Sequence, residues 1–460
     1  MKSNTGLLVL AISAAVSGGA IAAVSADEAR QLGTTLTSHG AEKAGNKEGT
    51  IPEYTGQPIK MPAGYNPKDP GQHPDPFNEK PLFSITAQNY TKYLDKLDGS
   101  AEMFKRFPQY RMDIYPSHRN FVYPKWVLDN AAKNLTSCKT SADELKLEGC
   151  YPGVPFLIPK TGAQVMWNHL TQFEARFYEG TSDNTVIPPN GAPVLQGLVY
   201  TIQSVPFYDP ARTTPQPSNV IFWRVRTNNI EPARTAGGKI VLLDALDATR
   251  RAYQYIPGQR RVKLAPDLAF DTPSPYGGGA YNIDDSKGFL GSLERFDWKL
   301  VGKKEKFIPY DNFALMDNKT CPAEKLHATK NFINPDCVRW ELHRVWVVQG
   351  DLKSGFRHNY KKRMMFWDED LFGGGVVENY DAGGSLYRVV NSISHPFYET
   401  PGGTGGFASG AFVTDLQTGI AATSGMGVCK VNGYSCGWSA GPDHGDIFYS
   451  PEGMAGEGIR

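Results

Sequence analysis

Alternation of apolar and polar residues is the feature that most restricts the fold of this 460-residue chain. A two-residue period, kept over about four to eight residues, is typical of a strand with one buried face. Such a period occurs in residues 199–204, 220–227, 239–243, 340–349, 358–367 and 379–390. Pro257-Gly258 separates two further alternating runs, 250–256 and 260–264, and Pro-Gly is turn chemistry for a hairpin. Successive hairpins predict one large curved antiparallel sheet.

Two segments with a helical period accompany the strands. Apolar side chains recur at helical spacing in residues 85–107, and a second such run begins at Thr161-Gly162 and extends to Phe177. A one-sided apolar stripe at this spacing predicts a helix that packs on another element. The expected fold class is therefore α+β, dominated by strands, with a few helices covering the sheet.

Composition excludes two classes of protein. The chain has 48 basic and 47 acidic residues, a net charge of +1, which argues against nucleic acid as its main partner. Apolar residues make up 40% of the chain, which is enough to build a core and too much for a disordered polymer.

The N-terminus has the three parts of a secretory signal. Lys2 is its only charge, residues 6–16 are apolar, and Val24-Ser25-Ala26 places small residues before a cleavage site. We expect residues 1–26 to be a signal peptide that is cleaved after Ala26, and the mature protein to be periplasmic. Its apolar run is shorter than the ~20 residues of a membrane-spanning helix, and no longer run follows, so no transmembrane segment is expected in the mature chain.

Six cysteines fall into three closely spaced pairs. Six cysteines allow about 15 connectivities, and the simplest is the local set: Cys138 with Cys150, Cys321 with Cys337, and Cys429 with Cys436. Metal binding is the weaker interpretation, because the chain has no Cys-x-x-Cys and no cysteine–histidine spacing of the zinc type. Disulfides agree with an oxidising compartment. No metal and no cofactor are expected.

Changes in composition divide the mature chain into three parts. Residues 27–82 are polar and rich in proline and glycine, which predicts an extended arm. Residues 83–395 contain the expected strands and helices, and residues 396–460 form a tail rich in glycine and cysteine.

Several ordered motifs resemble a bacterial periplasmic family, the domain of unknown function DUF1329. They run from about residue 28 to 370 and include Gly40-Ala41-Glu42-Lys43-Ala44-Gly45-Asn46, Pro159-Lys160-Thr161-Gly162, Tyr255-Ile256-Pro257-Gly258-Gln259-Arg260-Arg261-Val262 and Leu342-His343-Arg344-Val345-Trp346-Val347-Val348. The resemblance implies a fold similar to the lipoprotein-localisation carriers LolA and LolB, an incomplete antiparallel barrel closed by helices around an apolar cavity. It also implies association with a resistance-nodulation-division (RND) exporter and an outer-membrane partner. It supplies no catalytic residues.

Aromatic residues in the expected strands are candidates for the lining of such a cavity. Lipid sites are mostly apolar, and rigid aromatic side chains can hold space open, although a closely packed core would use the same residues. The candidates are Trp223, Tyr253, Tyr255, Trp298, Trp340, Trp346 and Trp367. Basic residues at Arg260, Arg261, Lys303 and Lys304 are candidates for contact with an anionic headgroup or an acidic partner; surface solvation is the alternative.

Catalytic chemistry has little support in the sequence. The chain lacks G-x-S-x-G, S-x-x-K, H-E-x-x-H and a Walker loop. The acidic runs Asp368-Glu369-Asp370 and Asp284-Asp285 are interpreted as solvated turns, with a cation site as the alternative. His343 and His358 are interpreted as structural histidines. A periplasmic carrier of a hydrophobic ligand is the preferred function, and a hydrolase or isomerase acting on a lipid or steroid, or an envelope scaffold, are the alternatives.

Overall fold

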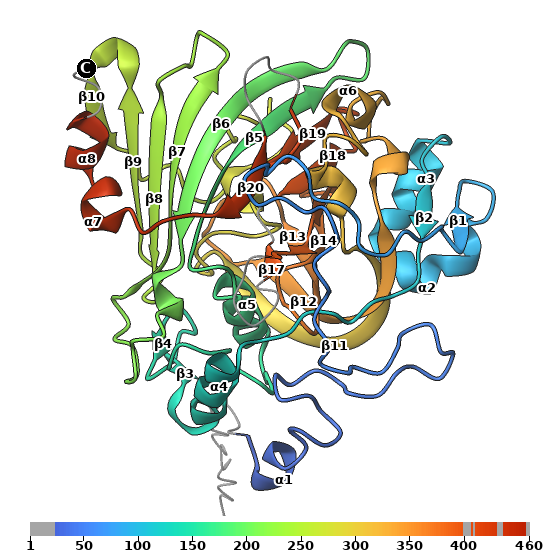
Figure 1. Ribbon diagram of the computed structural model, residues 1–460, viewed down its shortest axis with the longest axis vertical. Coiled ribbons are helices and arrows are strands. Elements are labelled where there is room, and N and C mark those ends of the chain that lie inside the picture. Colours follow the sequence, from blue (N-terminus) through green and yellow to red (C-terminus); the bar gives the residue numbers. More distant parts are fainter. Residues whose placement is uncertain (1–23, 399–405, 408–409, 430–435, 457–460) are drawn as a thin grey trace, which may run out of the picture.

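The computed structural model describes residues 24–398, 406–407, 410–429 and 436–456. In this part of the chain, 16 strands belong to one large sheet, with helices and long loops around it (Figure 1). The predicted β-dominated α+β class with a large antiparallel sheet is thereby confirmed. None of the helices among the described residues is long and apolar enough to span a bilayer.

The large sheet runs through strands that are far apart in the sequence. Its members are β1 (Phe83–Ile85), β2 (Met112–Ile114), β5 (Phe177–Ile187), β6 (Val194–Ser204), β7 (Ile221–Glu231), β8 (Lys239–Ala245), β9 (Arg250–Ile256), β10 (Arg261–Leu264), β11 (Phe296–Pro309), β12 (Trp340–Leu352), β13 (Lys362–Asp368), β14 (Gly375–Tyr380), β15 (Leu386–Ser392), β18 (Ala411–Asp415), β19 (Ala421–Ser424) and β20 (Gly437–Ala440). Two short sheets pair β3 (Lys139–Thr140) with β4 (Leu147–Glu148) and β16 (His395–Pro396) with β17 (Gly406–Phe407).

Helices are short except for two. They are α1 (Ala26–Ala29), α2 (Leu94–Leu97), α3 (Glu102–Arg106), α4 (Lys125–Ser137), α5 (Gly162–Leu170), α6 (Ala323–Leu326), α7 (Gly445–Phe448) and α8 (Pro451–Gly456). The helical period of residues 85–107 becomes four short helical segments: the 3₁₀ turn η1 (Tyr90–Tyr93), α2, the 3₁₀ turn η2 (Asp98–Ala101) and α3.

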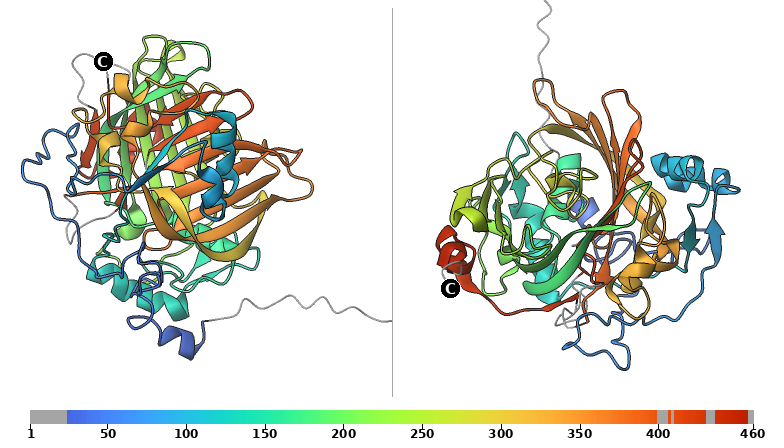
Figure 2. Two further views of the ribbon diagram at one scale, coloured as in Figure 1. Left: turned by 90° about the vertical axis from the view of Figure 1, so that its right-hand side faces the viewer. Right: turned by 90° about the horizontal axis from the view of Figure 1, so that it is seen from above.

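The sheet has two meandering halves. Strands β5 to β10 follow one another in sequence and pair as antiparallel neighbours, and β11 to β15 form the second half. Strands β18 and β19 lie between β15 and β5 and join the two halves. Its outermost strands, β1 and β10, are not paired with each other, so the described sheet is curved but not closed into a barrel (Figures 1 and 2).

The helix predicted from residue 161 is present as α5, but it ends at Leu170, and Phe177, the last residue of the predicted run, begins β5. The Thr161 side chain accepts a hydrogen bond from the backbone N–H of Gln164 and so caps the helix. A Cβ at Gly162 would lie 2.7 Å from the backbone of Trp298, so glycine permits close contact between α5 and β11. Nearly the whole helix is buried. It therefore packs across the second half of the sheet rather than lying on the surface.

The N-terminal segment extends over the outside of the sheet and reaches the core at a few points (Figure 1). His39, Ala41 and His73 are buried, although most of residues 27–82 are exposed or only partly buried. His39 Nε2 lies 3.0 Å from Asp370 Oδ1, and the Tyr54 hydroxyl donates to the carbonyl of Phe121. Residues 27–82 thus lack long regular elements but are attached to the body of the protein by buried polar contacts.

Residues after 395 contribute strands that were not predicted from the sequence. Strand β18 pairs with β15, β19 with β5, and β20 with the opposite end of β5. These segments are short and lie between glycine-rich stretches, so their period is hidden in the sequence. The C-terminal segment is therefore part of the sheet rather than only a loop-rich tail.

The three local disulfides expected from the cysteine spacing are present: Cys138–Cys150, Cys321–Cys337 and Cys429–Cys436. The first joins the end of α4 to the residue that follows the β3–β4 hairpin. The third connects the segments that follow β19 and precede β20.

Candidate functional site

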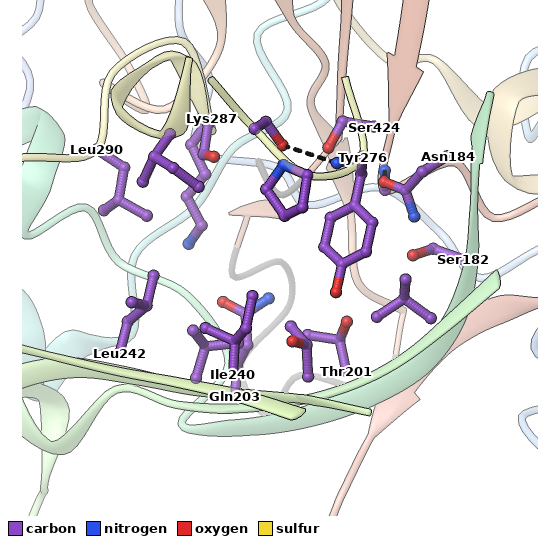
Figure 3. A pocket seen from close by; sticks show the side chains of 18 of the residues that line it. Ser182, Asn184, Thr201, Gln203, Ile240, Leu242, Tyr276, Lys287, Leu290 and Ser424 are labelled. Atoms are coloured by element: carbon purple, nitrogen blue, oxygen red, sulfur yellow. Dashed lines mark hydrogen bonds between the residues drawn. The ribbon is translucent and has the colours of Figure 1, made fainter. Parts of the chain in front are cut away.

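A cavity of about 140 Å³ lies between strands β5 to β8 and the loop segment 265–293, which we call the covering segment (Figure 3). An engineered apolar cavity of about 150 Å³ is large enough to take up benzene. The cavity is therefore large enough for a small apolar group. It is too small for a whole lipid.

Most of the cavity wall is apolar. The apolar side chains come from the strands and from the covering segment: Val199, Trp223, Val225, Ile240, Leu242, Ile283, Leu290 and Trp438. Polar side chains occupy alternate positions of β5 and β6, at Ser182, Asn184, Thr201 and Gln203. A wall of this kind can bury the apolar surface of a ligand, and its few polar side chains can orient that ligand.

The covering segment contributes the cavity's charged group. Lys287 and Tyr276 extend from this segment toward the strands that carry Gln203 and Thr201 (Figure 3). The Lys287 ammonium donates to both carboxylate oxygens of Glu174 at 2.8 Å. Burial raises the pKa of Tyr276 to about 12, so its hydroxyl stays protonated at neutral pH.

Gln203 links this ion pair to the aromatic wall. Its Oε1 accepts the indole N–H of Trp223 at 2.8 Å and lies 2.7 Å from the Tyr178 hydroxyl. The same hydroxyl lies 2.8 Å from Glu174. Because these polar groups form hydrogen bonds with one another, binding of an apolar ligand leaves none of them without a partner.

Buried ion pairs fasten the covering segment to the second half of the sheet. Arg363, which is fully buried on β13, donates to Asp284 at 2.7 Å and to Asp285 at 2.8 Å. His358 contacts Asp284, and the Tyr360 hydroxyl donates to Asp285. Burial alone would raise the pKa of Asp284, but the Arg363 charge and the contact with His358 together outweigh burial and lower it. The interpretation of Asp284-Asp285 as a solvated turn is wrong, because both carboxylates have buried cationic or hydroxyl partners.

The second acidic run is also buried and paired. Arg119 donates to both oxygens of Asp370 at 2.8 Å, and Lys303 donates to Glu369 at 2.8 Å. Asp368 lies 2.8 Å from His343. Asp368-Glu369-Asp370 is therefore not a solvated turn either. Across the described residues, no group of three or more histidine, cysteine or acidic side chains has the geometry of a metal site.

His343 carries a charge in this network. Burial would lower its pKa, but the carboxylates of Asp368 and Glu341 outweigh burial and raise it to about 10. The imidazolium contacts both acids and stacks on Tyr310 at a centroid distance of 4.0 Å. His343 and His358 are both satisfied by buried carboxylates, as structural histidines would be.

The seven aromatic candidates do not gather at one place. Trp223 lines the cavity. Tyr253 and Tyr255 pack on the opposite face of the sheet with residues of the C-terminal helices. Trp298 lines a separate, more polar hollow beside Asp297 and Lys353. The remaining three do not line the cavity.

These three tryptophans have packing partners of their own. Trp340 contacts Phe412 edge to face, and Trp367 stacks on His169 of α5 at 3.6 Å. Trp346 lies under the Lys303 ammonium. Aromatic content alone therefore could not separate cavity lining from core.

The basic candidates divide into two kinds. Lys303 binds Glu369, and Lys304 binds Asp98. Arg260 and Arg261 are exposed in the β9–β10 hairpin. Only the second pair is available to an external anion.

Most residues of the cavity lining are not among the candidates predicted from the sequence. Polar residues at alternate positions of β5 and β6 were the available signal, whereas Lys287 and Glu174 are brought together only by the fold. Among the described residues that line the cavity there is no histidine and no cysteine.

A family model described as a protein of unknown function, DUF1329, matches residues 84–452. The chain therefore belongs to this family, which confirms the resemblance found in its sequence motifs. An uncharacterised protein of Pseudomonas aeruginosa is 35% identical over 474 residues, an alignment that covers 99% of this chain and 98% of the relative.

Solved structures give weaker matches. A DUF1329 family protein from Desulfovibrio piger has a TM-score of 0.39 at 11% identity, covering 61% of this chain and 92% of that one. A putative outer membrane lipoprotein-sorting protein domain from Vibrio parahaemolyticus has a TM-score of 0.40 at 10% identity, covering 64% and 97%. A LolA superfamily protein from Nitrosomonas europaea has a TM-score of 0.31 at 11% identity, covering 59% and 94%.

Proposed function

We propose that this protein is a carrier that binds the apolar part of a hydrophobic or lipid-like molecule in the cavity beneath the covering segment. The observation that carries the proposal is the apolar wall on the inner face of β5 to β8, enclosed by residues 265–293. Burying about 300 Å² of ligand surface at ~25 cal/mol per Å² provides about 7 kcal/mol. Association costs reduce this value, which leaves roughly micromolar or weaker, reversible binding.

The size of the cavity defines how a larger ligand would bind. At about 140 Å³ the cavity accommodates one short apolar segment. The rest of the molecule would leave past partly exposed lining residues such as Thr227, Ile240 and Tyr276. Alternatively, the covering segment would move outward and enlarge the site. Either route gives a reversible exchange, which a carrier needs.

We propose that this carrier acts in the periplasm, after removal of residues 1–26. Three disulfides support an oxidising compartment. The partners proposed with it, an RND exporter that supplies or receives the ligand and an outer-membrane protein, rest on the family resemblance of the sequence. Co-purification of the two partners from crosslinked cells is the direct measurement.

Ligand retention tests the function. Protein purified from the periplasm is extracted and its bound lipids are identified by mass spectrometry. Leu242→Trp fills the cavity, and Leu243→Trp is the matched control, because Leu243 lies on the opposite face of the same strand. We expect retention to be lost in the first variant and kept in the second. A folded Leu242→Trp protein with the same lipids would refute the proposal, and turnover of the bound molecule by the wild type would identify an enzyme.

A further inference from the structure

The β9–β10 hairpin is a cationic segment at the edge of the sheet. Residues 248–266 contain no acidic side chain and five basic ones: Arg250, Arg251, Arg260, Arg261 and Lys263. Arg250 is neutralised, because it binds Asp244 through two hydrogen bonds at 2.6 and 2.7 Å. The other four are exposed. Within the part of the chain that the structure describes, none of these four forms an ion pair.

Strand pairing connects this hairpin to the cavity. Ile240, which lines the cavity, is paired with Gln254, and Gln254 is paired with Lys263. Directly paired residues project from the same face of a sheet. Lys263 therefore projects from the cavity face, two strand spacings or about 10 Å from Ile240. Arg261 lies two residues before Lys263 and so shares this face.

The two remaining cations have different positions. Arg251 is paired with Leu243, so it projects from the opposite face. Arg260 occupies the turn, in a left-handed conformation with φ of 49°. The hairpin thus has one pair of cations, Arg261 and Lys263, on the cavity face. Arg251 and Arg260 have the same charge and are also exposed, but they lie elsewhere in the hairpin.

Nearby acidic groups do not neutralise the cavity-face pair. Glu452 is exposed on α8, and Met454 of that helix packs on the face opposite the cavity. Asp267 is exposed beyond the end of β10 and forms no ion pair with the hairpin. Gln254 and Ile256, which lie between the cavity and the two cations, are only partly buried. An open strip of sheet therefore leads from the apolar wall to two unneutralised positive charges.

We propose that the ligand is an anionic amphiphile, whose apolar part occupies the cavity and whose carboxylate or phosphate lies against Arg261 and Lys263. This inference rests on the proposed carrier function and adds the charge of the ligand. The distance of about 10 Å between Ile240 and Lys263 along the sheet fits a molecule with one acidic end. The Arg261 guanidinium can bind such an acidic group through two hydrogen bonds, and the Lys263 ammonium on the same face adds a point charge.

Binding of three short amphiphiles tests the inference: decanoate, decyl phosphate and decanol. Dissociation constants are measured by calorimetry for the wild type, for Arg261→Glu/Lys263→Glu, and for the matched control Arg251→Glu/Arg260→Glu. We expect the first variant to bind both anions about tenfold more weakly than the wild type and decanol equally well. The control carries the same change in net charge and should differ little. A stronger effect on decyl phosphate than on decanoate would identify a phosphate headgroup, and the reverse a carboxylate.

The possible failures are distinguishable. If decanol binds, but Arg261→Glu/Lys263→Glu binds the two anions as tightly as the wild type does, the carrier function stands and the inference about ligand charge is overturned. Equal losses in both variants would also overturn it, because the effect would then be one of general charge. If none of the three amphiphiles binds the wild type, the proposed function itself fails.

Discussion

Replacing Arg363 with methionine should loosen the covering segment. Arg363 is fully buried, and its guanidinium binds Asp284 and Asp285, which lie in the 3₁₀ turn η5 (Ile283–Asp285). Ile283 in the same turn lines the cavity. The substitution keeps an apolar stem in the core but removes the charge shared by two buried carboxylates. Stability and access to the cavity should therefore change together.

The size of the effect follows from the partners that remain. Removing one member of a buried ion pair costs about 3–5 kcal/mol, mainly because the other charge stays buried. Asp284 keeps its contact with His358, and Asp285 keeps the Tyr360 hydroxyl, so we expect a loss of about 3 kcal/mol, the lower end of that range. Lys125→Met is the control, because its partner Asp129 is also exposed and such pairs contribute less than about 1 kcal/mol.

Urea unfolding and limited proteolysis measure the two consequences. We expect Arg363→Met to lower the unfolding midpoint and to make residues 265–293 susceptible to protease under native conditions. Adding Asp284→Asn and Asp285→Asn should recover part of the stability, because no buried charge is then left unpaired. A variant as stable and as protease-resistant as Lys125→Met would show that Arg363 does not hold the covering segment.

Two further predictions concern the other buried network. The folded-state pKa of His343 lies near 10, above its usual value near 6.5, so its stabilising effect is complete below pH 6.5 and is lost as the pH rises through 10. The difference in free energy of unfolding between wild type and His343→Gln should therefore shrink by up to ~1.4 kcal/mol per pH unit between pH 6.5 and pH 10. Unfolding at a series of pH values measures this difference, and a difference that stays constant would contradict the prediction. Asp370→Asn weakens contacts to Arg119 and His39, so we expect faster cleavage within residues 27–82 by trypsin, and unchanged cleavage would show that other contacts hold this segment.

The strands predicted from the sequence are those in which apolar and polar residues alternate, and β5 lacks this alternation. Strands β6 to β10 and β12 show a clear two-residue period and were expected. In β5, Ser182 and Asn184 face the cavity while Asp183 and Thr185 are buried on the other side, so polar residues occupy both faces. A strand with this composition has no visible period, because its polar groups are satisfied inside the protein rather than by water.

The acidic runs were misinterpreted for a related reason. Charged residues at strand ends are usually solvated, and the sequence carries no sign of the partners that bury them. Arg363 follows Asp285 by 78 positions, and Arg119 precedes Asp370 by 251. Only the folded structure brings these groups together. The same holds for Lys287 and Glu174, so the charged parts of the site could not be derived from local patterns.

Cys429→Ser/Cys436→Ser should alter the cavity at the junction of the two halves of the sheet. This disulfide connects the segments between β19 and β20, and Ser424, Gly425 and Trp438 in or beside those strands line the cavity.

The Cys429–Cys436 disulfide closes a short loop, and its loss lowers the free energy of unfolding by about 2–3 kcal/mol in the chain-entropy model. We also expect faster release of decanoate, measured by stopped-flow displacement, because β20 is then less restrained beside β5. Cys321→Ser/Cys337→Ser is the control: it removes a loop of 16 residues whose cysteines do not line the cavity. It should destabilise the protein to a similar extent without changing release. Equal acceleration in both variants would mean that release follows global stability, and that the junction has no particular role in holding the ligand.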